Sequence, residues 1–141
     1  MQDTIIETSI HIARSVEDVF TTLADPPGWP AWYPSSRSVH RTPDGAVEWL
    51  TPMGMPLRIR WRIQRTFPQG QIRKRGRICG FYPIEIVYNV SPEDGGTRFH
   101  RLMCYPVPPG LGKIDRTVLC PFFQQESVAA LNRFKQLLEG A

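Results

Sequence analysis

Four polar side chains could do chemistry in this sequence, because an alternating pattern turns each of them toward the interior. Lys74, Tyr88, Arg101 and Tyr105 lie in segments where apolar residues recur at every second position. Amino, guanidinium and phenol groups can donate hydrogen bonds to a carbonyl oxygen and can stabilise an enolate. If the protein is an enzyme, these residues are the candidates for its catalytic groups.

Proton transfer, which cyclisation or dehydration also needs, has weaker support in the sequence. The alternation places no carboxylate on the inward face of any strand, and it places His11, His40 and His100 outward or at strand ends. The sequence contains no nucleophile elbow and no glycine-rich phosphate loop. Its three cysteines lie far apart, with no histidine at metal-ligand spacing. We therefore favour binding over catalysis and expect neither a metal nor a nucleotide cofactor.

Seven strands are predicted to position these residues. Pro68 and Gly70 predict a turn between the fourth strand and the fifth. The last strand has an ambiguous phase, and we take the face of Met103 as inward because it has more apolar bulk. This choice buries Arg101, which then needs a partner or a polar ligand. The segments that alternate are 4–13, 37–41, 46–50, 57–65, 71–79, 83–90 and 97–105.

Two helices complete the predicted elements. A short helix over 16–24 begins after Ser15 and ends at the DPPG of 25–28. Residues 111–141 predict a long amphipathic helix, and Pro121 predicts either a kink or the start of its regular part. Its apolar face includes one hydroxyl, Ser127, which needs a partner such as a ligand or water. That face carries Cys120, Phe123, Ser127, Leu131, Phe134 and Leu138.

A basic face is predicted on the outer side of the sheet. Its arginines are Arg58, Arg60, Arg62, Arg73, Arg75 and Arg77. One interpretation is a solvated face, relieved by Glu48 and Glu85 on the flanking strands. The other is a docking patch for an anionic surface such as membrane headgroups, RNA or an acidic protein. No aromatic residue interleaves these arginines in the predicted phase, which disfavours nucleic acid as a partner.

Length and composition bound the class of protein. The 141 residues suit a single domain, 1–141, with 41% hydrophobic and 21% charged residues. No apolar run approaches the roughly 18 residues needed to span a membrane, so we do not expect an integral membrane protein. The first residues lack the pattern of a secretory signal, and the expected location is the cytoplasm.

The order of these elements resembles the helix-grip fold of the START and polyketide cyclase superfamily, also called SRPBCC. The opening IHIARSVEDVFTTL of 10–23, the WPAW corner of 29–32, the GGT turn of 95–97 and the LNRFKQLLE of 131–139 each look like a motif of that superfamily. The resemblance implies an α+β fold, in which a seven-stranded curved antiparallel sheet wraps around the C-terminal helix. Short helices would lie between strands 1 and 2.

The resemblance also implies an elongated apolar cavity that receives a lipophilic molecule. Binding of such a molecule, with or without its transport, is the expected function. A polyketide cyclase or dehydratase acting in the same cavity is the alternative, and a docking module that uses the basic face is a further one. The aromatic run at 29–34 is then either a packed corner or the rim of this cavity. The expected ligand-binding residues are Trp29, Trp32, Tyr33, Trp49, Ile59, Trp61, Ile86, Tyr88, Arg101, Met103, Tyr105, Ser127 and Leu131.

Overall fold

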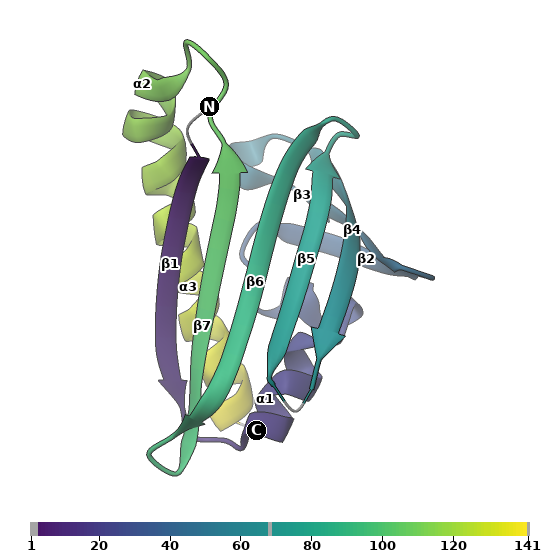
Figure 1. The fold of residues 1–141 in the computed structure, drawn as a ribbon, viewed down its shortest axis with the longest axis vertical. Coiled ribbons are helices and arrows are strands. Elements are labelled where there is room, and N and C mark those ends of the chain that lie inside the picture. Colours follow the sequence, from purple (N-terminus) through teal and green to yellow (C-terminus); the bar gives the residue numbers. More distant parts are fainter. Residues whose placement is uncertain (1–2, 68, 141) are drawn as a thin grey trace.

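The computed structural model describes residues 3–67 and 69–140, and within them the chain forms one antiparallel sheet against one long helix (Figure 1). Pro68 of the predicted turn and Ala141 lie outside the described residues. The strand order is β1-β7-β6-β5-β4-β3-β2, so the first and last strands are neighbours. The strands are β1 (Asp3–Ile12), β2 (Ser36–Thr42), β3 (Gly45–Leu50), β4 (Leu57–Thr66), β5 (Gln71–Ile78), β6 (Tyr82–Glu93) and β7 (Gly96–Pro106).

Two α-helices and several single turns connect and cover the sheet. Helix α1 (Val16–Leu23) begins where the Ser15 side chain accepts a hydrogen bond from the backbone N–H of Asp18 at 3.1 Å. The short turns η1 (Pro26–Ala31) and η2 (Pro52–Gly54) follow α1 and β3. Helix α3 (Cys120–Glu139) crosses the inner face of the sheet behind β1 and β7 (Figure 1). The predicted α+β helix-grip fold is confirmed. None of the helices in the described residues is long and apolar enough to cross a membrane.

The start of the long helix settles the question that Pro121 raised. A short turn α2 (Gly112–Ile114) leads into a π-helical turn η3 (Asp115–Leu119), and α3 begins at Cys120. Pro121 therefore lies in the first turn of α3, directly after the π-helical turn, so the hydrogen-bond pattern of the helix changes next to the residue that has no N–H to donate. The sequence predicted either a kink at Pro121 or the start of the regular helix, and in the structure the regular helix starts at Cys120, next to this proline.

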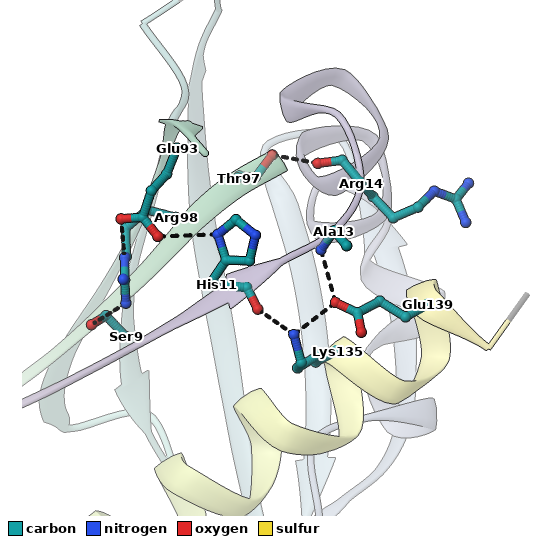
Figure 2. A network of polar contacts seen from close by, with 9 residues as sticks. All are labelled: Ser9, His11, Ala13, Arg14, Glu93, Thr97, Arg98, Lys135 and Glu139. Carbon is teal, nitrogen blue, oxygen red and sulfur yellow. Dashed lines mark hydrogen bonds and ion pairs between the residues drawn. The ribbon is translucent and has the colours of Figure 1, made fainter. Parts of the chain in front are cut away.

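Polar contacts tie the far end of α3 to the strand edge (Figure 2). Lys135 donates to the backbone oxygen of His11 at 2.6 Å and to the Glu139 carboxylate at 2.7 Å. Glu139 also accepts from the backbone N–H of Ala13 at 2.8 Å. His11 points away from the core and contacts Glu93 at 3.0 Å. This closed, polar end lies opposite the end where α2 and the β5–β6 turn are found (Figure 1).

The phase of each strand decides which side chains face α3. In β7 the face of Phe99, Arg101 and Met103 is buried, as predicted. In β3 the prediction is wrong, because Glu48 is buried and Trp49 is 44% exposed. Strand β3 pairs with β4 so that Trp49 lies opposite Arg58. A shift of one residue turns every side chain to the other face, and the alternation of so short a strand does not fix its phase.

Candidate functional site

Two adjacent chambers, which share six lining residues, lie between the inner face of the sheet and the helical segments. The inner chamber has a volume of about 40 Å³, and the outer chamber has a volume of about 230 Å³. The inner one is closed off by the aromatic corner at Trp29 and Trp32, and the outer one opens between the loops at the α2 end. The residues that line both chambers are Pro52, Leu57, Ile78, Ile84, Met103 and Phe123.

Lys74 carries its charge into the inner chamber. The residue is only 3% exposed, and its ammonium lies 3.7 Å from the ring centroid of Trp29, 4.6 Å from that of Trp61 and 5.0 Å from that of Tyr88. These rings stabilise the cation through their electron-rich faces but accept no ordinary hydrogen bond. No hydrogen-bond or ion-pair partner of this ammonium lies among the described residues. Its three donors therefore remain available to a bound molecule.

Arg101 is the second buried cation of the inner chamber. Its guanidinium donates to the Ser127 hydroxyl at 2.6 Å and lies over the Tyr33 ring, 5.0 Å from the centroid. Ser127 also contacts the Thr8 hydroxyl at 2.9 Å. The buried hydroxyl on the helix face thus has partners within the protein. The Nε–H of Arg101, by contrast, is buried with no acceptor among the described residues.

Two buried carboxylates also line the inner chamber, and Glu48 of β3 contradicts the expectation that no carboxylate lies on the inward face of a strand. Glu48 accepts a hydrogen bond from the Trp61 indole at 2.9 Å, and Glu126 accepts one from the Ser35 hydroxyl at 2.9 Å. Burial raises the pKa of Tyr33, and the negative charge of Glu126 adds to this rise while Arg101 opposes it. The Tyr33 phenol is therefore a neutral hydrogen-bond donor across the physiological pH range.

The polar groups of the inner chamber are unevenly satisfied. Both carboxylates have donors, whereas the Lys74 ammonium, the Arg101 Nε–H and the Trp32 indole N–H have no acceptor among the described residues. A buried donor without an acceptor costs about 1–3 kcal/mol. The chamber can recover this free energy by taking in a molecule that carries an oxygen acceptor.

The outer chamber is apolar apart from one polar cluster. Tyr105 donates to the buried Asp115 carboxylate at 2.6 Å, and Thr4 donates to the same carboxylate at 2.6 Å. Burial and the Asp115 carboxylate raise the pKa of Tyr105. The cluster joins β1, β7 and the π-helical turn η3. Tyr105 is therefore engaged in holding these elements together.

The structure brings most of the predicted ligand-binding residues together. Tyr105 lines the outer chamber only, and Ser127 and Leu131 are buried in the core without lining either chamber. Trp49 lies on the opposite face of the sheet, so its prediction as a pocket residue is wrong. Those that line the inner chamber are Trp29, Trp32, Tyr33, Ile59, Trp61, Ile86, Tyr88, Arg101 and Met103.

Three polar residues of the inner chamber were missed from the sequence. Glu126 follows Phe123 by three residues and precedes Ala130 by four, so a second helical stripe could have revealed it. Glu48 alternates with Ala46 and Leu50, but the bulk of Trp49 favoured the other face. The third residue, Ser35, lies in the loop before β2, where the sequence offers no periodic signal.

The arginines predicted on the outer face of the sheet do lie there, exposed except for the half-buried Arg73. Arg60 pairs with Arg77 across β4 and β5, and Arg62 pairs with Arg75. Like charges in directly opposite positions destabilise a sheet. All four of these arginines line a surface groove of about 770 Å³ that extends to β6 and β7.

Only one of the two acids predicted to compensate the arginines of the outer face does so. Glu85 contacts Arg73 at 2.9 Å and Arg75 at 2.7 Å, as the solvated-face interpretation requires. Glu48 is buried and cannot contribute. An aromatic residue also lies on this face, because Arg58 stacks over Trp49 at 5.6 Å. The expectation that no aromatic accompanies the arginines is therefore wrong.

Comparison with known protein families now places the chain. The family described as "Polyketide cyclase / dehydrase and lipid transport" matches residues 3–139. The chain belongs to this family. No curated protein matches the sequence.

Solved structures agree with this family at the level of the fold. The chain is similar to the Zhui aromatase/cyclase from Streptomyces sp. R1128, with a TM-score of 0.83, 16% identity, and coverage of 98% of this chain and 94% of that one. A START superfamily protein from Mycobacterium smegmatis has a TM-score of 0.72 and 17% identity, over 94% and 98% of the two chains. The di-domain ARO/CYC BexL of the BE-7585A biosynthetic pathway has a TM-score of 0.73 and 21% identity, over 99% of this chain and 47% of that one.

Proposed function

We propose that this family member binds or transports a lipophilic small molecule that carries an oxygen acceptor at one end. The observation behind this proposal is the set of donors without an acceptor among the described residues that line the inner chamber: the buried Arg101 Nε–H and Trp32 indole N–H, and the Lys74 ammonium beside three aromatic rings. The acceptor oxygen would lie in the inner chamber. The apolar body of the ligand would fill the outer one.

The sizes of the chambers support this orientation. A water molecule needs roughly 10–15 Å³ of such volume, so the 40 Å³ of the inner chamber suits a group of about three heavy atoms. The outer chamber, with about 230 Å³ and mostly apolar walls, suits a larger hydrocarbon or ring system.

Native mass spectrometry of protein purified from its own source tests this proposal. We expect a hydrophobic molecule to co-purify and to be lost from the Trp61→Ala variant, because Trp61 walls the inner chamber. The Arg60→Ala variant is the control, since this side chain lies on the outer face of the sheet. Loss of the molecule from Arg60→Ala alone would show that the ligand binds outside the cavity.

A cyclase or dehydratase activity is the second candidate, and the two buried carboxylates favour it. Glu48 or Glu126 could accept a proton from carbon next to a ligand carbonyl, while Lys74 and Arg101 stabilise the enolate oxygen. The similarity in fold to the Zhui aromatase/cyclase is compatible with such chemistry. The Glu48→Gln and Glu126→Gln variants separate the two functions. An enzyme would lose turnover and keep the bound molecule, whereas a carrier would show no turnover in the parent protein.

A further inference from the structure

Exposed apolar side chains gather around the opening of the outer chamber. We call this set the apolar rim: Met53, Met55, Phe81, Leu111, Ile114 and Val118. They are six of the eleven large hydrophobic residues that are exposed in the described part of the chain. Four of them line the outer chamber, while Phe81 and Val118 adjoin lining residues. Met53 and Met55 lie in or just after η2, Phe81 lies in the β5–β6 turn, and Leu111, Ile114 and Val118 lie in the segment from α2 into η3. The β5–β6 turn and α2 are at the same end of the molecule (Figure 1). Apolar patches of this kind mark interaction sites.

Most charges around the apolar rim are positive, and one acid, Asp3, lies at the same end in a pocket with Arg116. Segments 52–57, 79–82 and 106–114 contain no Asp or Glu, and their one charged residue is Lys113. Arg58, Arg77 and Arg116 flank these segments and have no ion-pair partner within the described residues. The acid next in sequence, Asp115, is buried and accepts hydrogen bonds from Tyr105 and Thr4. An apolar surface surrounded by unpaired cations suits an anionic, amphipathic partner.

We infer that the apolar rim docks on an anionic lipid bilayer. The rim side chains enter the boundary between headgroups and acyl chains, and the flanking cations meet the phosphates and carboxylates of the headgroups. Trp49 is exposed beside Arg58 at the same end of the sheet, and tryptophan prefers this interfacial depth. The outer chamber opens within the rim, so a lipophilic molecule could pass between bilayer and cavity without crossing water.

A second copy of the chain fits this surface less well. A symmetric dimer through the rim would bring the cations Arg58, Lys113 and Arg116 that surround one rim close to the cations that surround the other. Like-charge contacts across an interface are unfavourable. Nucleic acid is also disfavoured, because Phe81 is the only rim side chain that could stack on a base.

Vesicle co-sedimentation tests the inference with the full chain. We expect binding to vesicles of phosphatidylcholine mixed with phosphatidylserine, weaker binding to phosphatidylcholine alone, and weaker binding as salt rises. Phe81→Glu and Val118→Glu should each lower the partition coefficient by about tenfold or more, because both place an anion in the interface. Neither residue lines a chamber, so ligand affinity without vesicles should remain. The two measurements therefore test membrane docking and ligand binding independently.

A matched control exists at the other end of the long helix. Leu137 is 41% exposed and Val118 is 48% exposed, but about 28 Å of helix separates the two positions. Leu137→Glu makes the same chemical change and should alter vesicle binding by less than about twofold. Equal losses in Leu137→Glu and Val118→Glu would contradict the inference. So would the absence of any vesicle binding, or a dimer in analytical ultracentrifugation that Phe81→Glu dissociates.

The arginines of the outer face provide the remaining control. Arg62 and Arg75 form a cross-strand pair on that face. This pair lies two residues further from the rim segments than the pair of Arg60 and Arg77. If Arg62→Ala and Arg75→Ala abolish vesicle binding while Phe81→Glu retains it, the docking surface is the basic face and the rim is not involved.

Discussion

Lys74 shows how one residue can combine a cost in stability with a role in binding. The residue is only 3% exposed, and its ammonium lies near three aromatic rings. A desolvated ion costs several kcal/mol, whereas cation–π contacts return about 2 kcal/mol. A methionine at this position would not carry the cost of desolvation. The ammonium of Lys74 lies in the chamber where a ligand oxygen would lie.

Replacing Lys74 by methionine should separate these two effects. Methionine fills a similar volume without a charge, so we expect Lys74→Met to raise the free energy of unfolding by about 1 kcal/mol. The same variant should bind the co-purifying ligand at least about tenfold more weakly, because it lacks the ammonium donors. Urea denaturation and ligand titration measure the two quantities. A variant that is both less stable and equally competent in binding would show that Lys74 is a structural residue.

The sequence predicted the two buried cations but not the two buried acids. Lys74 lies in an eight-residue strand whose alternation indicates its phase, and Arg101 was placed inward because its face of β7 has more apolar bulk. Glu48 lies in a six-residue strand, and its acceptor role depends on the Trp61 indole of the next strand. Such a pairing between strands cannot be read from local periodicity, because it depends on the register of the sheet.

Helix α3 is fastened to the sheet by buried polar contacts as well as by its apolar stripe. Ser127 lies midway along the helix and contacts both Thr8 of β1 and Arg101 of β7. The sequence singled out this hydroxyl as needing a partner. It could not supply the partners, because β1 and β7 are adjacent only in the folded sheet.

The contacts of Ser127 predict a large effect of a small substitution. Ser127→Ala removes the acceptor of a buried guanidinium, and we expect the free energy of unfolding to fall by about 2–3 kcal/mol. Thr117→Ala is the control, because this exposed hydroxyl donates only to the backbone oxygen of Lys113. It should cost less than about 0.5 kcal/mol. Equal stability of Ser127→Ala and the parent protein in urea denaturation would refute the importance of this contact.

At the scale of the whole molecule, one end of the structure is polar and the other is apolar. Salt bridges and backbone contacts close the end near Lys135 and Glu139, while apolar side chains surround the open end. The sequence did not predict that β1 and β7 are neighbours in the sheet. Local patterns predict the elements, but the path that brings the two chain ends together is set by global packing.

The stability of the whole molecule should decline in alkaline solution. Burial raises the pKa of Tyr33 in the folded state above the value of about 10 found in unfolded chains. Above pH 10 the unfolded state has lost a proton that the folded state retains, so the free energy of unfolding falls as pH rises. Each such tyrosine contributes up to about 1.4 kcal/mol per pH unit. Tyr33→Phe should give a shallower slope in urea denaturation from pH 9 upward, and an unchanged slope would contradict the assignment.

The π-helical turn limits the changes in length that this chain could accept during evolution. One extra residue in η3 puts Asp115 on the same face as Cys120 and Phe123. Without it, Asp115 would align with Leu119 and Phe122, about 100° away. A deletion within 115–119 would thus separate the Asp115 cluster from the stripe that packs on the sheet. Substitutions in this turn can be absorbed, but insertions and deletions should be selected against.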